Sequence, residues 1–207
     1  NEANTSPRSP WIGLPTTAYP KREQAAVFYT QLHERLKALP GVQSVSFGSS
    51  VPMTGVDTDL GFVIEGRPAP PPGQTQGAWF SIVGHDYFRT LNIRLRDGRA
   101  FDDRENANST FTTVISESLA RRYWPNESPV GKRISFGGQP PQWCEIVGVV
   151  SDVHHFGLSS DARPTLYLSN QQRPRNFMTL VMRTSGDPQS YVAAVRKEVQ
   201  ALDKNLA

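Results

Sequence analysis

The chain has little of several features that mark common classes of protein. Its single cysteine, Cys144, excludes a disulfide within the chain. No apolar run is longer than five residues, whereas a membrane-spanning helix needs about 20. The 22 basic and 19 acidic residues leave a net charge of +3, which is too small to indicate a nucleic-acid partner. No signal peptide is visible, so we expect either a cytosolic protein or a soluble piece of a longer one.

The composition is that of a folded chain with many turns. Hydrophobic residues make up 37% and charged residues 20% of the 207 positions, which is ordinary for a globular protein. This length allows one large domain or two small ones, each able to bury a core. The 17 prolines and 16 glycines indicate many short strands and turns.

The first 52 residues predict a strand, a helix and a second strand. Residues 11–16 form a candidate edge strand, because Pro15 cannot donate to a sheet ladder. Pro20 opens a helix that Pro40 and Gly41 end. Its predicted apolar face comprises Ala25, Phe28, Leu32, Leu36 and Leu39. The strand that follows places Val45 and Phe47 on one side and Ser44 and Ser46 on the other.

The end of the chain repeats this pattern. Residues 178–184 predict a strand, and Asp187 followed by Pro188 predicts the start of a helix that ends near Asp203. Its predicted apolar stripe is Val192, Val195, Val199 and Leu202. Two such units commonly pair into a split βαβ, ferredoxin-like sheet with both helices on one face. We therefore predict an α+β fold in which residues 1–52 and 175–207 form one layer.

Residues 53–174 are predicted to be an insertion of mixed α/β structure. Its densest β-branched cluster, within residues 143–156, predicts a buried central strand. Short helices are expected near residues 86–91 and at 117–124, the latter capped by Ser116. Further strands are expected at 61–65, 78–83, 111–115, 133–136 and 165–168. The charged stretch 89–105 is interpreted as a solvated surface with local ion pairs.

Two candidate chemical sites, a phosphate-binding loop and a hydrolase serine, are weak. The sequence ESPVGKR departs from a phosphate-binding loop, because Asn126 and Arg133 stand where glycine and Ser/Thr are needed. The serines that could suggest a hydrolase lack a G-x-S-x-G elbow, and one of them has a sufficient role as a helix cap; they are Ser49, Ser50, Ser116 and Ser118. We therefore expect no catalytic residue among them.

A metal site is also not favoured. Asp152 and His154 share one face of the central strand, whereas His155 points to the other face. Cys144 lies eight residues away from Asp152, and His33 and His85 are separate in the sequence. We interpret these histidines as surface or capping residues and expect neither a metal nor another cofactor.

Aromatic residues of the middle segment leave two interpretations open. Trp79, Phe88, Phe101 and Trp124 could line a groove for an amphiphilic ligand. Together with Tyr123 and Phe136, they could equally fill a compact core among short strands, which is the interpretation we favour.

Four stretches resemble one known family, the MacB-like periplasmic core domain of bacterial ABC transporter permeases, a class that also contains the LolC and FtsX types. They are LPGVQSVSFGSSVPM (39–53), HDYFRTLNIRLRDGRAFDDREN (85–106), TTVISESLARRYWPNESPVGKRISF (112–136) and EIVGVVSDVHHFGLSSDARPTLYL (145–168). The resemblance covers about residues 40–205, and the closest similarity is to large permeases of unknown substrate that are abundant in acidobacteria.

The resemblance implies a porter-like layer made by both chain ends, with a Sabre-like subdomain inserted between them. It implies a periplasmic location between two transmembrane helices of a permease, ATP hydrolysis on a separate cytoplasmic ATPase, and a dimeric full transporter. It also implies a periplasmic adaptor or carrier protein as a possible partner, and no catalytic residues in this domain.

Three functions are therefore weighed. The first is a non-enzymatic domain that couples nucleotide-driven movement of membrane helices to a substrate- or partner-facing surface. The second is a periplasmic sensor that binds a ligand or lipid among the aromatic residues. An enzyme is the least favoured, because no constellation of residues supports catalysis.

Overall fold

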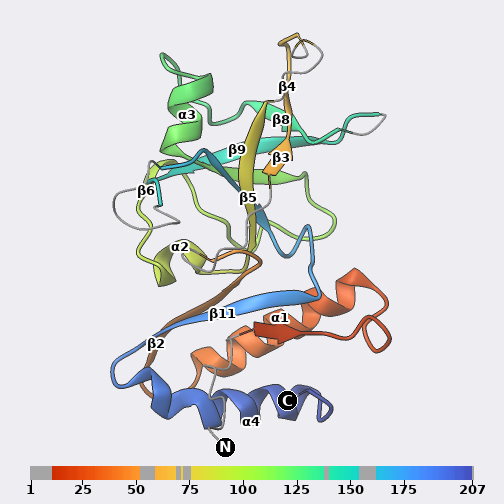
Figure 1. Cartoon of the computed structure of the whole chain (residues 1–207), viewed down its shortest axis with the longest axis vertical. Helices are drawn as coiled ribbons and strands as arrows, with labels where there is room; N and C mark the ends of the chain where they lie inside the picture. Colours follow the sequence, from red (N-terminus) through yellow and green to blue (C-terminus); the bar gives the residue numbers. More distant parts are fainter. Residues whose placement is uncertain are drawn as a thin grey trace, which may run out of the picture.

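The computed structural model describes residues 11–51, 59–68, 71, 76–137, 140–153 and 162–206. In these residues, eleven strands join into one sheet that mixes parallel and antiparallel pairs, and helices pack against it. Figure 1 shows a lower part that contains both described chain ends and an upper part built from the middle of the chain. The predicted α+β class is confirmed.

The lower part, which we call the chain-end layer, contains three strands and three helices. Strand β11 lies between β1 and β2 and is antiparallel to both, so β1 and β2 run parallel. Strand β11, from the end of the chain, therefore pairs with two strands from its beginning. The elements of this layer are β1 (Trp11–Gly13), α1 (Arg22–Lys37), β2 (Val42–Gly48), β11 (Phe177–Thr184), the 3-10 helix η1 (Pro188–Tyr191) and α4 (Val192–Leu202).

One hydrophobic cluster holds the chain-end layer together. Helix α1 buries the residues of its predicted apolar face within the helix, together with Tyr29. Leu206, at the end of the described residues, belongs to the same cluster, and Ile12, near their start, packs against it. Tyr19 donates a 2.9 Å hydrogen bond to Oδ2 of Asp203, which ties the two ends further. Both described ends of the chain therefore lie in one layer.

The remaining elements form what we call the middle part. They are β3 (Asp59–Gly61), β4 (Val63–Ile64), β5 (Gly77–Val83), α2 (Tyr87–Thr90), β6 (Leu95–Gly98), β7 (Thr112–Ser116), α3 (Glu117–Tyr123), β8 (Arg133–Ser135), β9 (Trp143–Val150) and β10 (Thr165–Ser169). The strand order through the whole sheet is β1-β11-β2-β5-β10-β7-β9-β8-β4, with β3 beside β5 and β6 beside β9. The β5–β10 and β7–β9 pairs are parallel, and the other pairs are antiparallel.

Strand β9 is the buried centre of the middle part, as predicted. Ile146, Val149 and their β-branched neighbours are enclosed by two hydrophobic clusters on its two faces. Gly148 is required here, because a Cβ at this position would collide with the backbone carbonyl of Arg99. Arg99 directly follows β6, which pairs with β9. The glycine thus marks a neighbouring strand that the sequence did not reveal.

Several sequence-based expectations differ from the structure. The stretch 89–105 is not only a solvated surface, because it contains the edge strand β6. The single strand expected at 61–65 is divided into β3 and β4. Val192 was expected on the apolar stripe of α4 but is 52% exposed, and it is the first residue of that helix. Ser46 lies on the face opposite Phe47 yet is fully buried, because α2 packs against β2.

Candidate functional site at the junction of the two parts

The chain-end layer and the middle part are joined through a narrow stretch of sheet. Strands β2 and β5 share one paired position, Gly48 with Val83. Two backbone hydrogen bonds of 2.8 Å flank it, from Gly84 N to Phe47 O and from Ser49 N to Ile82 O. By contrast, β11 and β2 are paired along six positions. The backbone connection between the parts is therefore much weaker than the connections within the chain-end layer.

Side chains reinforce this connection. The hydroxyl of Ser49 accepts a 2.8 Å hydrogen bond from Ile82 N, and the Ser81 hydroxyl donates a 2.7 Å hydrogen bond to Ser50 O. Tyr87 of α2 lies against Gly48, where an added Cβ would stand 2.8 Å from its ring. Ser49 and Ser50 therefore have structural roles at the junction.

Apolar packing also crosses the junction. Phe80 and Phe136 contact both the chain-end cluster and the cluster around β9. Ile82 of β5 and Leu168 of β10 end inside the chain-end cluster. Two polar contacts add to this, from Arg183 of β11 to Thr90 O at 3.2 Å and from Gln171 to the Thr30 hydroxyl at 2.7 Å. The two parts are thus in firm contact but meet over a small region.

A polar cleft of about 330 Å³ opens at this junction, between α1 and the turns of the middle part. Its lining residues are Thr30, His33, Glu34, Lys37, His85, Asp86, Phe101, Asp102 and Asp103. His33 Nε2 lies 3.7 Å from Asp86 Oδ2, and Lys37 Nζ lies 3.9 Å from the same oxygen. The centroids of the His33 and His85 rings are 6.2 Å apart. The structure therefore brings together two histidines that the sequence left unconnected.

Asp102, at the rim of this cleft, is held in its ionised form. Hydrogen bonds from the Arg104 side chain and backbone, with the charge of Arg99, lower the pKa of this carboxyl well below its usual range. Burial has the opposite effect on the pKa of Tyr87, which it raises above the ordinary tyrosine value. The rim of the cleft is thus negatively charged at Asp102.

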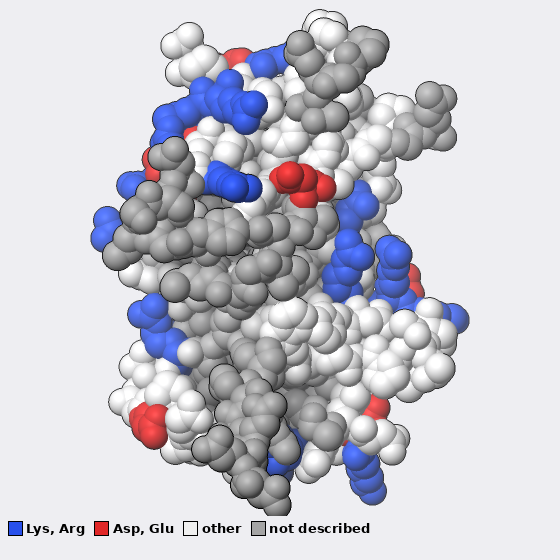
Figure 2. All heavy atoms as spheres, viewed as in Figure 1, with Lys and Arg blue, Asp and Glu red and all other residues white. Residues whose placement is uncertain are grey.

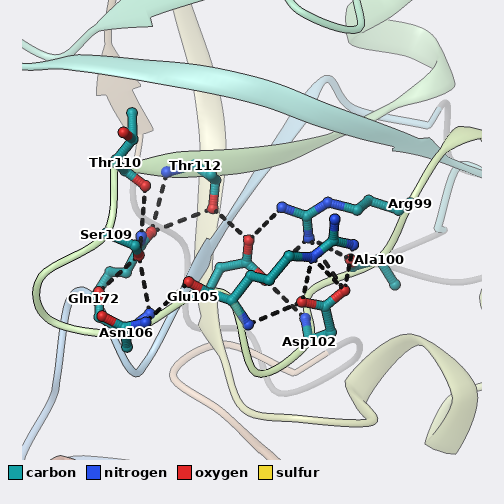
Figure 3. Close-up of polar contacts among 10 residues, drawn as sticks. Arg99, Ala100, Asp102, Glu105, Asn106, Ser109, Thr110, Thr112 and Gln172 are labelled. Carbon is teal, nitrogen blue, oxygen red and sulfur yellow. Dashed lines mark hydrogen bonds and ion pairs between the residues drawn. The ribbon is translucent and has the colours of Figure 1, made fainter.

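A buried polar network next to the cleft fixes the loop that contributes Asp102 (Figure 3). The side chain of Glu105 is 1% exposed and accepts two hydrogen bonds from Arg99, of 2.7 and 3.1 Å. It also accepts bonds from Asp102 N and the Thr112 hydroxyl. Gln172 accepts from Thr112 N and donates to Ser109 and Thr110. The loop therefore holds the cleft rim in place.

A second cleft, of about 290 Å³, lies at the far end of the middle part beside β4 and β8. Buried Trp124 lies at its wall, with the guanidinium of Arg67 5.4 Å from the indole centroid. Charged side chains pair across it, including Lys132 with Glu127 at 2.8 Å. On the face shown in Figure 2, Lys and Arg side chains occur in separate groups with Asp and Glu nearby, in keeping with the net charge of +3.

The four aromatic residues singled out in the sequence do not come together. Phe88 and Phe101 contact each other, with centroids 6.0 Å apart, in the cluster beside α2. Trp124 belongs to the cluster beneath α3. Trp79 lies under the guanidinium of Arg163, 4.5 Å from its ring centroid. Trp79, Phe88 and Trp124 are buried, so they contribute to packing in separate places.

The residues considered for a metal site are likewise separate. Asp152 accepts a 2.7 Å hydrogen bond from Ser118 N and pairs with Arg121, so it supports the start of α3. Burial raises the pKa of the Cys144 thiol. His154 and His155 lie outside the described residues. Among those that the structure describes, no group of three or more His, Cys, Asp or Glu could hold a metal ion.

Two further expectations concern local structure. Ser116 caps α3, since its hydroxyl accepts hydrogen bonds from Leu119 N and Thr165 N. The ESPVGKR stretch leads through a turn at Gly131 (φ +84°) into strand β8, as expected for a loop without a phosphate-binding helix. In the described parts of the chain, no helix is long and apolar enough to cross a membrane.

Comparison with known proteins gives a match to a family model. Residues 9–202 match the family model described as MacB-like periplasmic core domain. A macrolide export ATP-binding/permease protein MacB from Bartonella henselae is 31% identical over 127 residues, which cover 60% of this chain and 17% of that protein. MacB 2 from Aeromonas hydrophila is 32% identical over 80 residues, which cover 39% of this chain and 12% of that protein. The chain thus spans a small part of the length of these relatives.

Solved structures share the fold. The periplasmic region of MacB from Actinobacillus actinomycetemcomitans matches with a TM-score of 0.58 and 18% identity, over 84% of this chain and 73% of that chain. The extracellular domain of the ABC-type transporter YknZ from Gram-positive bacteria matches with a TM-score of 0.55 and 18% identity, over 94% and 92% of the two chains.

Proposed function

Because this chain belongs to the family of MacB-like periplasmic core domains, we propose that it is the non-catalytic extracytoplasmic domain of a bacterial ABC transporter permease. It couples movement of the transmembrane helices of that permease to a surface that faces a substrate or a partner. ATP hydrolysis takes place on a separate cytoplasmic ATPase. A periplasmic adaptor or carrier protein, and a second permease copy in a dimer, are the expected partners.

One observation carries this proposal: two well-packed parts meet through a single paired position of β2 and β5. Coupling of movement requires stiff parts whose relative position can be biased from one side. Both described chain ends lie in the chain-end layer, since Leu206 belongs to its cluster and Ile12 packs against it. Helices that continue from these ends into a membrane would therefore act on that layer first. We propose residues 1–52 and 175–207 as the porter-like subdomain and 53–174 as the inserted, Sabre-like one.

The first test is the gene itself. Transmembrane helices encoded on both sides of this segment, together with an adjacent ABC ATPase gene, are expected. A reading frame without such helices would remove the proposal.

The second test is a cross-link across the cleft in the permease that contains this chain. Glu34 and Asp103 line the cleft from opposite parts, so cysteines at both positions can be joined by a flexible bismaleimide. We expect the cross-link to reduce transport-coupled ATP hydrolysis. The matched control joins Arg35→Cys to Glu198→Cys, whose native side chains pair at 2.7 Å within the chain-end layer. Equal activity of both cross-linked proteins would contradict coupling through the junction.

A sensor that binds a lipid or other amphiphile is the alternative function. The cleft beside Trp124 favours it, whereas the division of the aromatic residues between separate clusters does not. A rise in melting temperature on addition of phospholipid, lost in Trp124→Ala but kept in Trp11→Ala, would support this alternative. No shift in the unaltered protein would remove it.

A further inference from the structure

His33 is a buried polar residue that the fold leaves incompletely satisfied. It lies in the middle of α1 and is 5% exposed. Its Nδ1 is 3.1 Å from Glu34 Oε1, but its Nε2 has no hydrogen-bond partner among the residues that the structure describes. The group nearest to Nε2 for an ionic contact is Asp86 Oδ2, at 3.7 Å. A buried ring nitrogen without a partner is costly, so its position opposite a carboxylate requires an explanation.

Asp86 is the matching group on the other side of the junction. It precedes α2 in a left-handed conformation (φ 60°), and its carboxylate does not cap that helix. Three cationic or protonatable groups surround it at 3.7 to 3.9 Å, on His33, Lys37 and Arg89, and none is within hydrogen-bond distance. The carboxylate is therefore attracted from several sides without a close partner.

The lining of the cleft carries more negative than positive side chains. Among the described residues that line the cleft, Lys37 is the one lysine or arginine. Four carboxylates lie in the same lining. These are Glu34 on α1, Asp86 before α2, and Asp102 and Asp103 on the rim turn. Asp102 is already paired with Arg104 and Arg99. An excess of negative charge therefore remains around Asp86 when the histidines are neutral.

The second histidine faces outward. His85 Nδ1 lies 3.9 Å from Asp103 Oδ1, and the Asp103 side chain is fully exposed. Protonation of His85 therefore forms a solvated pair, which contributes little. Its ring centroid is 6.2 Å from that of His33, so two charged rings would repel each other modestly. His33, which is buried and aimed at Asp86, is the histidine whose charge acts across the junction.

We propose that the His33–Asp86 pair is an acid-responsive clamp between the chain-end layer and the middle part. At low pH the protonated His33 ring donates from Nε2 to the Asp86 carboxylate and draws α1 against the turn before α2. A charge-assisted hydrogen bond of this kind is about 2.8 Å long, so a small closure from the present 3.7 Å completes it. At higher pH the proton leaves, the bond is lost, and the junction loosens.

Histidine is suited to this role because it ordinarily changes charge around pH 6.5. The importance of the clamp for a transporter rests on the proposed function, since an extracytoplasmic domain experiences the external pH. The acid response itself is a property of this chain and is tested on the chain alone. Its failure and a failure of the proposed function are therefore distinguishable.

The test is a double-mutant cycle at two pH values. His33→Gln, Asp86→Asn and the double variant are unfolded with denaturant at pH 5 and pH 8. We expect the coupling between the two positions to change the unfolding equilibrium by roughly fivefold or more at pH 5, and to be close to absent at pH 8. Equal coupling at both pH values would overturn the clamp. The control, His85→Gln, should leave the pH dependence in place; if it abolishes it, the proposal is wrong.

A second measurement does not depend on a change at His33. In ¹⁵N-histidine-labelled protein at pH 5, the Nε2–H proton of His33 should exchange slowly with water and resonate downfield because of its hydrogen bond. In Asp86→Asn this signal should disappear or move to the position of a solvated imidazolium. The same signal in both proteins would show that Asp86 does not accept this hydrogen bond, and the clamp would be excluded.

Discussion

The chain-end layer and the middle part are stabilised in different ways. The chain-end layer uses long elements, with helices of 16 and 11 residues whose apolar faces meet one cluster. The middle part has helices of 4 and 7 residues and depends on buried polar anchors such as Glu105 and Ser116. Long amphipathic helices distinguish the first region, whereas the second combines two hydrophobic clusters with buried polar anchors. Substitutions should therefore affect the two regions differently.

The largest effect is expected from a charge in the centre of the middle part. Val149 is 4% exposed in the central strand β9, so Val149→Asp buries an unpaired carboxylate and should cost ~3–5 kcal/mol of unfolding free energy. The control is Leu95→Asp on the neighbouring strand β6, where Leu95 is 46% exposed and the cost should be small. Equilibrium denaturation measures both. Similar stabilities of the two variants would show that β9 is not the buried centre.

Removing the charge of Glu105 and, separately, that of Glu198 compares the ion pairs of the two regions directly. Glu105→Gln removes the buried carboxylate that pairs with the Arg99 guanidinium. We expect the free energy of unfolding to fall by ~2–4 kcal/mol. In the chain-end layer, Glu198→Gln breaks the pair with Arg35, which is more exposed, and should cost less than ~1 kcal/mol. Denaturant unfolding of both variants checks this order. The reverse order would contradict the distinction between the two regions.

The hydroxyl of Ser116 should have an intermediate effect. It accepts hydrogen bonds from Leu119 N at 3.4 Å and Thr165 N at 2.9 Å, so Ser116→Ala removes a helix cap and a contact to β10. We expect a loss of ~1–2 kcal/mol, measured by thermal unfolding. Ser118→Ala keeps both of these contacts and removes only the 2.9 Å hydrogen bond between the two hydroxyls, so it serves as the control and should cost less. A larger loss in the control would assign the cap to the wrong serine.

The smallest effect is the dependence of stability on acid at the cleft rim. The pKa of Asp102 is lowered by Arg104, so its ionised form stabilises the fold at neutral pH. This contribution is present above the unfolded-state pKa of about 4 and is lost as the pH falls through the lower folded-state value. Because the side chain is 45% exposed, the difference between Asp102→Asn and the unaltered protein should stay below ~1 kcal/mol at pH 7 and shrink as the pH falls below about 4. A difference that grows toward pH 2 would have the wrong sign.

The sequence predicted the elements that local patterns encode. The repeat of Phe28, Leu32 and Leu36 predicted α1, and the cluster of Ile146, Val147, Val149 and Val150 predicted β9. The matching element order of the chain ends predicted their association, and β11 pairs with both β1 and β2. These features depend on residues close together in the chain, which is why a pattern can reveal them.

The junction could not be predicted in the same way. His33 and Asp86 are 53 positions apart, and neither spacing nor composition indicates that α1 lies against the turn before α2. Strand β6 was missed because its exposed residues lack apolar alternation. Its presence is reflected in the need for glycine at position 148, where a Cβ would collide with the backbone of Arg99. The role of Glu105 was hidden because it stands in a run of charged residues that looked solvated.

The most direct test measures the distance between the two parts in the permease that contains this chain. Spin labels at Lys197→Cys on α4 and Arg122→Cys on α3 report on the chain-end layer and the middle part, since both positions are exposed. Pulsed electron resonance should give different distance distributions in the nucleotide-free and ATP-bound states. A control pair within the chain-end layer, at Lys197 and Arg22, should stay unchanged. Identical distributions for both label pairs in the two states would contradict movement about the junction.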